Sequence, residues 1–221
     1  MDIVAGLSIG RTFLTQMDAF LAANWQHLTC DDIYRVYDQF FNDLKDFKGN
    51  AYGFTGLSEY LVFRFLYHQL GGSFRRERIT RDLSDFVGKS NAWRIGQSIP
   101  VRVGDRHRRC LPDIVLYQED RLMMAIQVKL YLTAGVSEVR REAATFAELR
   151  ALNPGDFRAL LLIYSHSLSG RGSVRQELAG HKNASDWFDF VVLKGNHERL
   201  ADRLDTSLLL SRLQPPLHKH T

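Results

Sequence analysis

Residues 122–132 read LMMAIQVKLYL, and this stretch decides the fold. Every even position in it is apolar, whereas the odd positions include Gln127 and Lys129. Successive side chains of a β-strand point to opposite faces, so the alternation predicts a strand with one apolar face. Gln127 and Lys129 then share the other face, where a polar side chain and a cation lie next to each other.

The strand before it is predicted over Arg109–Tyr117, and it places Asp113 on an alternating face. A three-residue turn at Glu119–Arg121 would pair the two strands so that Asp113 lies opposite Gln127. A two-residue turn would put the two side chains on opposite faces. The convergence of Asp113, Gln127 and Lys129 therefore requires the longer turn or a β-bulge.

The rest of the chain alternates between helical and strand periodicity, which predicts an α/β fold with a mixed central sheet flanked by helices. From the helix that carries Glu59 onward, the core order is α-β-β-β-α-β, with a linking stretch before the first strand. We expect an N-terminal helical extension over residues 1–50, one domain over 51–213 and a flexible tail over 214–221. The predicted helices are Arg11–His27, Asp31–Phe47, Ser58–Leu70, Ser137–Leu152, Val174–Gly180 and His197–Leu213; the further strands are Arg94–Val103, Ala159–Ser165 and Trp187–Lys194.

The charge is divided unevenly along the chain. The net charge is +4, but residues 1–50 hold 4 Lys and Arg against 7 Asp, so the remainder carries +7. Residues 51–110 alone hold 11 basic against 5 acidic side chains. Such an excess suits a polyanionic partner, because neutralising phosphates releases condensed counterions; a solvated basic face is the alternative reading. The arginines that we single out are Arg75, Arg76, Arg78, Arg81, Arg106, Arg108 and Arg109.

Pro112-Asp113 followed by Gln127-Val128-Lys129 resembles the PD-(D/E)xK signature of the restriction-endonuclease-like superfamily, whose core order is also α-β-β-β-α-β. The resemblance covers residues 56–165, about half of the chain. Gln127 stands where the family usually has Asp or Glu, and this QxK form is similar to Mrr-type endonucleases. The resemblance implies a Mg²⁺-dependent nuclease, with Mn²⁺ as a possible substitute and DNA as the expected substrate.

The same resemblance implies roles for the individual residues. Asp113 is the principal metal ligand, and Glu59 restores the charge that Gln127 lacks, since Mg²⁺ prefers oxygen ligands. The metal polarises the scissile phosphate and lowers the pKa of a bound water, which Lys129 orients. Arg140 and Arg141, on the helix after Lys129, are candidates for phosphate contact, with a solvated helix face as the alternative.

Two other readings of these residues stay open. One is a nuclease-like module that binds nucleic acid or a partner protein without cleaving it, in which Gln127 marks the loss of activity. The other is a plain structural sheet, with Glu59 favoured near a helix start only by the helix dipole. The helical extension would serve for dimerisation or substrate positioning in the nuclease reading.

Several other classes find no support in the sequence. No apolar run approaches the ~20 residues that span a bilayer, so a cytoplasmic location is expected. Cys30 and Cys110 form no CxxC pair and predict neither a disulfide framework nor a zinc site. The sequence also lacks the HExxH spacing, the GxSxG elbow and a complete P-loop.

Overall fold

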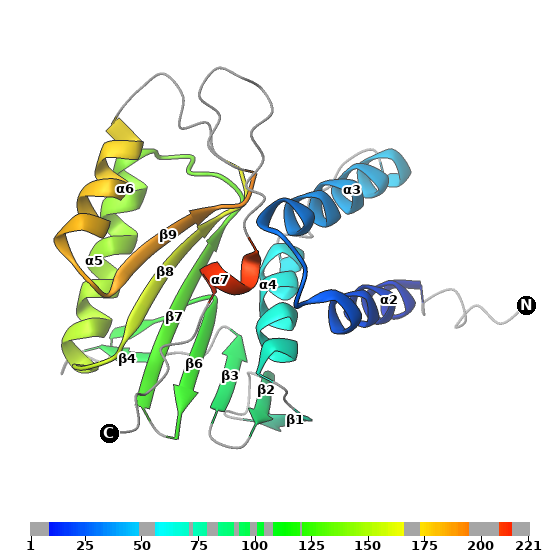
Figure 1. Cartoon of the computed structure of the whole chain (residues 1–221), viewed down its shortest axis with the longest axis horizontal. Helices are drawn as coiled ribbons and strands as arrows, with labels where there is room; N and C mark the ends of the chain where they lie inside the picture. Colours follow the sequence, from blue (N-terminus) through cyan, green and yellow to red (C-terminus); the bar gives the residue numbers. More distant parts are fainter. Residues whose placement is uncertain are drawn as a thin grey trace, which may run out of the picture.

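The computed structural model is an α/β protein in which a mixed β-sheet lies between two layers of helices (Figure 1). This confirms the predicted α/β class with a mixed sheet flanked by helices. The structure describes residues 9–48, 56–70, 73–78, 84–90, 93–97, 101–103, 108–119, 121–165, 173–194 and 208–213. Side chains are described over the same ranges except residues 9–12, 44–48, 73–78, 84–90, 101–103 and 108–110.

The main sheet has seven strands in the order β1-β2-β3-β6-β7-β8-β9. Neighbours from β1 to β7 are antiparallel, whereas β7, β8 and β9 run parallel to one another. The strands are β1 Ser73–Arg78, β2 Ser84–Ser90, β3 Trp93–Gln97, β6 Ile114–Gln118, β7 Arg121–Lys129, β8 Arg158–Ile163 and β9 Phe188–Val192; a separate pair joins β4 Val101–Val103 to β5 Arg108–Cys110.

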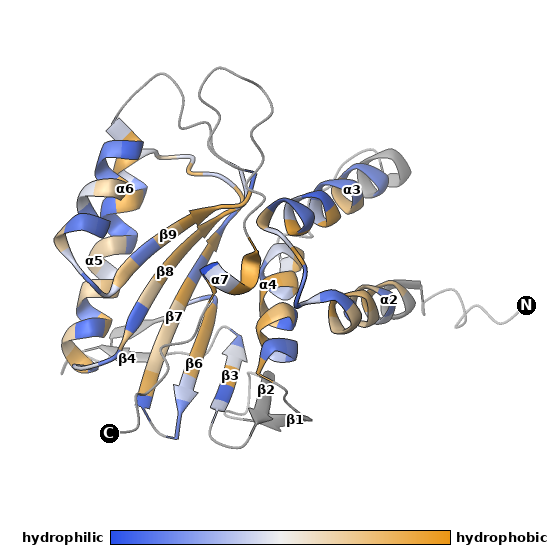
Figure 2. Cartoon of the chain, in the orientation of Figure 1, coloured by the Kyte–Doolittle hydropathy of each residue, from blue (hydrophilic) through white to orange (hydrophobic). Residues whose placement is uncertain are grey.

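The helices divide between the two faces of the sheet (Figure 1). The crossover helices α5 (Val136–Leu152) and α6 (Ser173–Ala184) cover one face. On the other face lie α4 (Gly56–Gln69), with α2 (Ile9–Asn24) and α3 (Cys30–Lys48) outside it, and the short helix α7 (Leu209–Arg212). Figure 2 shows that the central strands are largely apolar, as expected for strands that are covered on both sides.

Helix α4 is the centre of its layer. It is apolar nearly all round, because one side packs on the sheet and the other on α2 and α3. Asp18 of α2 accepts hydrogen bonds from the Arg64 guanidinium and, at 2.9 Å, contacts Nε2 of His68, both on α4. Met17 and Tyr37 of the outer helices belong to the same core cluster as α4 and the sheet. The N-terminal helices are thus packed into the common core.

The β6–β7 hairpin has a two-residue connection and a bulge. Gln118 pairs with Arg121, so of the two arrangements considered the three-residue turn is not the one formed, and Glu119 in the connection has a φ of 54°. The register then shifts, because Tyr117 pairs with Leu122 but Leu116 pairs with Met124. Met123 is therefore the extra residue of a β-bulge, the second of the two arrangements that bring Asp113 opposite Gln127.

The bulge also corrects the predicted apolar face of residues 122–132. Met124, Ile126 and Val128 pack toward α4, whereas Leu122, which precedes the bulge, belongs to the opposite core, with α5 and α6; Leu132 also belongs to that core but lies beyond the end of β7 at Lys129. A one-residue insertion reverses the facing of every side chain beyond it. All of these residues are buried, so the pattern of apolar letters could not reveal the change of face.

The other boundaries differ from the predictions mainly at prolines. The predicted strand Arg94–Val103 is two strands, β3 and β4, separated by a stretch containing Pro100, and Arg109–Tyr117 is divided into β5 and β6 around Pro112. Proline has no N–H to donate to a strand ladder. The linking stretch before them contains β1 and β2, which we did not predict.

Helices α2 to α6 and strands β8 and β9 were predicted correctly, with small shifts at their ends. Of the predicted terminal helix His197–Leu213, only residues 208–213 are described, and they contain α7; the tail at 214–221 lies outside the described residues. No helix in the part of the chain that was searched is long and apolar enough to cross a membrane.

Candidate active site

The candidate site lies at the end of the sheet where β6 begins and β7 ends. Asp113 immediately precedes β6, and its Oδ2 atom accepts two hydrogen bonds from β7: one from Nε2 of Gln127 at 2.6 Å and one from the backbone N–H of Val128 at 2.6 Å. The predicted convergence of Asp113 and Gln127 is therefore present. Both hydrogen bonds fall on one oxygen, so Oδ1 makes none within the described part of the chain.

The surroundings of Asp113 oppose its ionisation. Burial raises the pKa of the carboxyl group from 3.8 to about 6, and the hydrogen bond from Val128 lowers it only in part. The carboxylates of Glu59 and Glu142 raise the pKa further, whereas the Lys129 cation lowers it. Two neighbouring carboxylates therefore disfavour the Asp113 anion, and a bound cation would relieve that repulsion.

Lys129 points to helix α5. Its Nζ atom lies 3.1 Å from Oε1 of Glu142 and 3.8 Å from Oε1 of Glu138. These two carboxylates are only 8% and 6% exposed, and charged side chains are seldom buried without a partner. Sequence reasoning missed both of them. The available signal was their i, i+4 spacing on the helix directly after Lys129, which puts them on one helix face.

Glu138 also fixes the beginning of α5. Its Oε2 atom accepts a hydrogen bond from the backbone N–H of Ala134 at 3.3 Å, and it lies in the first turn, where the helix dipole favours an anion. Gly135 precedes the helix with a φ of 59°, a left-handed conformation that side chains rarely adopt. The chain can thus turn sharply after β7 and return α5 across the site.

Glu59 reaches the same region from α4. It lies in the first turn of the helix, and Oε2 accepts a hydrogen bond from Nε2 of Gln97 on β3 at 3.4 Å. The preceding residue is buried, and its carbonyl accepts a hydrogen bond from the Tyr164 hydroxyl at 2.8 Å. That bond ties the start of α4 to the end of β8. Glu59 is thereby held within electrostatic reach of Asp113.

The two arginines predicted on α5 make ion pairs within the protein. Nε of Arg140 lies 2.9 Å from Glu177, which joins α5 to α6. Arg141 lies 3.1 Å from Glu142 and 3.6 Å from Glu138. Both side chains are largely exposed, so contact with phosphate remains sterically open to them.

The remaining predicted arginines are placed only by their backbone or not at all. Arg75, Arg76 and Arg78 lie on the edge strand β1, and Arg108 and Arg109 lie on β5; their side chains are outside the described set. Arg106 and Arg81 fall outside the described residues altogether.

The donor atoms suit a hard divalent cation. Asp113 and Glu59 offer carboxylate oxygens, and Mg²⁺ commonly uses only one or two protein carboxylates, with water and phosphate completing its shell. Gln127 offers an amide oxygen when its N–H₂ group is directed to Asp113. Among the residues searched, no three His, Cys, Asp or Glu side chains are arranged to hold a metal by themselves.

Comparison of the chain with protein-family models, with characterised proteins and with solved structures finds no match. The function must therefore be inferred from the geometry around Asp113.

Proposed function

We propose that this chain is a divalent-metal-dependent endonuclease with a restriction-endonuclease-like core of the PD-(D/E)xK type, and that it hydrolyses DNA. The observation that carries the proposal is a pair of hydrogen bonds across the antiparallel β6–β7 hairpin, from the Gln127 side chain and the Val128 backbone to Asp113. Lys129 follows directly after Val128. When β1, β2, β4 and β5 are left aside, the elements α4, β3, β6, β7, α5 and β8 occur along the chain in the α-β-β-β-α-β order of that core.

The residues divide the chemistry among them. Asp113 and Glu59 would hold the cation, with Gln127 adding an amide oxygen. A Mg²⁺ ion held by these residues would polarise a phosphodiester and make an attacking water more acidic. Lys129 orients that water and stabilises the charge that grows on the phosphate, since a fixed cation acts most strongly where charge develops. Glu142 holds the Lys129 amine in position at 3.1 Å, so it is a positioning residue.

The charge distribution supports a polyanionic substrate. The part of the chain after residue 50 carries +7, and eleven of its basic residues precede the β6–β7 hairpin. Binding should accordingly weaken steeply as salt concentration rises, because phosphate contacts release counterions.

The direct test is cleavage of supercoiled plasmid, linear duplex, branched DNA and RNA with Mg²⁺ or Mn²⁺. We expect Asp113→Asn and Lys129→Met each to lower the cleavage rate by at least about 100-fold, the usual effect of removing a preorganised charge. Asp43→Asn, an exposed carboxylate on α3, is the matched control and should cleave normally. Absence of cleavage on every substrate, or equal rates in all four proteins, would contradict the proposal.

A second candidate function is a nuclease-like module that binds DNA without cutting it. Two observations favour it: an amide stands at Gln127 in place of a carboxylate, and Lys129 is engaged by Glu142 and Glu138. Salt-dependent binding without cleavage would support this function. Gln127→Glu distinguishes the two cases, because it supplies the missing carboxylate and should create metal-dependent cleavage in a chain that has lost it.

A further inference from the structure

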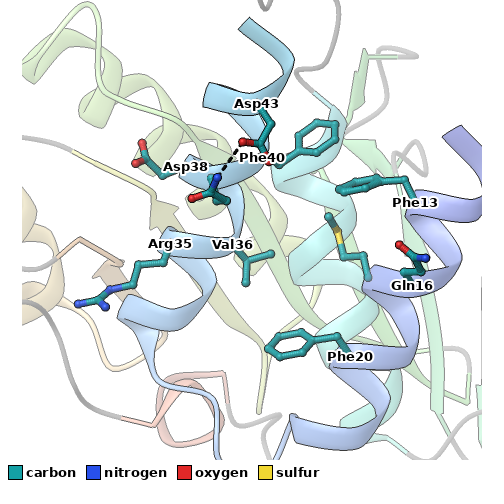
Figure 3. A pocket seen from close by; sticks show the side chains of 10 residues that line it. Phe13, Gln16, Phe20, Arg35, Val36, Asp38, Phe40 and Asp43 are labelled. Atoms are coloured by element: carbon teal, nitrogen blue, oxygen red, sulfur yellow. Dashed lines mark hydrogen bonds between the residues drawn. The ribbon is translucent and has the colours of Figure 1, made fainter. Parts of the chain in front are cut away.

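A groove lies between α2 and α3, the two helices that lie outside α4 (Figure 1). Its volume is about 510 Å³, within the range of ligand pockets. Figure 3 shows that Phe13 and Phe20 of α2 and Val36 and Phe40 of α3 point into it. At one end Phe13 and Phe40 stack with ring centroids 4.2 Å apart, and Phe20 on α2 is 42% exposed.

The lining residues follow helical spacing on both walls. On α2 they include Phe13, Met17 and Phe20, at positions i, i+4 and i+7, so they form one stripe along the helix. On α3 the apolar lining residues are Val36 and Phe40, at positions i and i+4, and the rim residue Asp43 follows at i+7. These two apolar stripes, about two turns long on α2 and one turn on α3, form a seat for one further helix, which would present apolar residues at i, i+3 or i+4, and i+7.

The rim of the groove is acidic. Asp38 accepts hydrogen bonds from the Tyr34 hydroxyl and the Asn42 amide, and Asp43 accepts one from the Gln39 amide; all of these donors are uncharged. Arg35, the cation of the lining, is paired with Asp31 at 2.6 Å. The first fifty residues carry −3 in total, opposite in sign to the rest of the chain. An apolar groove with two carboxylates on its rim selects a basic occupant.

We propose that this groove binds an amphipathic helix of a partner protein, with an apolar stripe flanked by lysine or arginine residues. The charge excludes the other two obvious occupants. A second copy docked by two-fold symmetry would bring two acidic rims together, and like charges at an interface oppose association. A nucleic-acid backbone would meet carboxylates. The acidic groove and the basic part of the chain therefore suit different partners, a protein helix and a nucleic acid.

The test uses the whole chain and two fluorescent 15-residue peptides that share leucines at helical spacing, one with lysine and the other with glutamate at all remaining positions. In fluorescence anisotropy we expect the lysine peptide to bind at least about tenfold more tightly, since opposite and like rim charges act in opposite directions. Equal affinity for both peptides, or tighter binding of the glutamate peptide, would overturn the proposal.

Matched substitutions locate the binding. Phe20→Ser should weaken binding of the lysine peptide about tenfold, because it removes an exposed aromatic side chain that the bound peptide would cover. Leu14→Ser, also on α2 and 39% exposed but not in the groove lining, should leave the affinity unchanged. The double variant Asp38→Lys/Asp43→Lys retains the apolar stripes and should transfer the preference to the glutamate peptide. Equal effects of the two serine substitutions, or an unchanged preference in the double variant, would reject the groove as the site.

Three further outcomes identify a different occupant, and each overturns the proposal. A dimer in light scattering that Phe20→Ser dissociates and Leu14→Ser does not would assign the groove to a second copy. A much lower thermal midpoint for Phe20→Ser than for Leu14→Ser without peptide would assign it to a segment of this chain. Duplex DNA binding that only Phe20→Ser weakens would assign it to the substrate.

Discussion

The two faces of β7 place opposite demands on neighbouring residues. On one face Met124, Ile126 and Val128 pack in an apolar core against α4. On the other face Leu122 and Ala125 also lie in an apolar core, but toward the end of the strand Gln127 and Lys129 meet Asp113 and the carboxylates of α5. Ile126 and Gln127 are adjacent in the chain, yet one is fully buried among hydrocarbon and the other serves a polar cluster.

The difference shows where the stability of the hairpin originates. Burying carboxylates costs free energy unless partners compensate for the lost hydration, so the polar part of this face, Gln127 and Lys129 with their partners, is expected to contribute little to folding. The apolar face contributes roughly 25 cal/mol for each Å² removed from water. Apolar burial on one face of a strand can therefore offset the free-energy cost of burying charged groups on the other face.

The largest effect is expected from shortening the apolar face. Ile126→Ala should lower the free energy of unfolding by about 3 kcal/mol, because it removes buried methyl groups and leaves a cavity. Gln127→Ala should cost about 1 kcal/mol, the usual value of one hydrogen bond. Urea denaturation of the two variants measures both. Similar losses at the two positions would show that the two faces do not differ in the way described.

The next effect tests the electrostatics of the polar face through pH. The pKa of Asp113 is about 6 in the folded chain and about 3.8 when unfolded, so the folded state binds the proton more tightly. The resulting stabilisation is complete below pH 4 and is lost as the pH rises through 6. With about 1.4 kcal/mol for each pKa unit, the total loss is about 2 to 3 kcal/mol.

The measurement is the free energy of unfolding at pH 4.5 and pH 8 for the native chain and for Asp113→Asn. The amide cannot ionise, so the native chain should lose more stability than the variant over this interval. Other titrating groups are common to both proteins and cancel in the comparison. Adding MgCl₂ at pH 8 should then raise the unfolding temperature of the native chain alone, since a ligand stabilises the state that binds it. If the free energy of unfolding depends on pH equally in both proteins, the pKa of Asp113 is not raised in the folded chain.

The sequence predicted the meeting of Asp113 and Gln127 only as one of two alternatives. Parity along a strand follows from the backbone, so the shared face of Gln127 and Lys129 could be predicted directly. The bulge at Met123 could not, because Met123 and Met124 are both apolar and either can be the extra residue. Whether Asp113 and Gln127 share a face therefore depended on a β-bulge, which does not alter the alternation of apolar and polar residues in the sequence.

The partners of Lys129 were missed for a different reason. Helix α5 was predicted nearly to the residue, but helical periodicity alone does not say which carboxylates approach β7. Glu138 and Glu142 lie on the same buried face as Val139 and Ala143, where a polar residue is unexpected. Strands β1 and β2 were missed because Ser73–Arg78 is dominated by charge and lacks the apolar alternation used to find strands.

The smallest effect concerns the coupling between Lys129 and Glu142, 3.1 Å apart. Lys129→Met alone leaves Arg141 as the remaining cation beside Glu142. The free energy of unfolding should therefore fall by about 1 to 2 kcal/mol, less than the ~3 to 5 kcal/mol typical of breaking a fully buried ion pair. Glu142→Gln should cost a similar amount. The double variant removes both charges, so its loss of unfolding free energy should be about 1 kcal/mol smaller than the sum of the losses in the two single variants.

A double-mutant cycle in urea measures this coupling, with Arg140→Gln and Glu177→Gln as a comparison pair on the exposed side of α5. That pair is open to solvent, and water and salt screen its attraction. The Lys129–Glu142 coupling should therefore persist in 0.5 M NaCl, whereas the Arg140–Glu177 coupling should disappear. If both couplings vanish in salt, Glu142 does not hold Lys129 in a desolvated position, and the polar face of β7 is simply a hydrated surface.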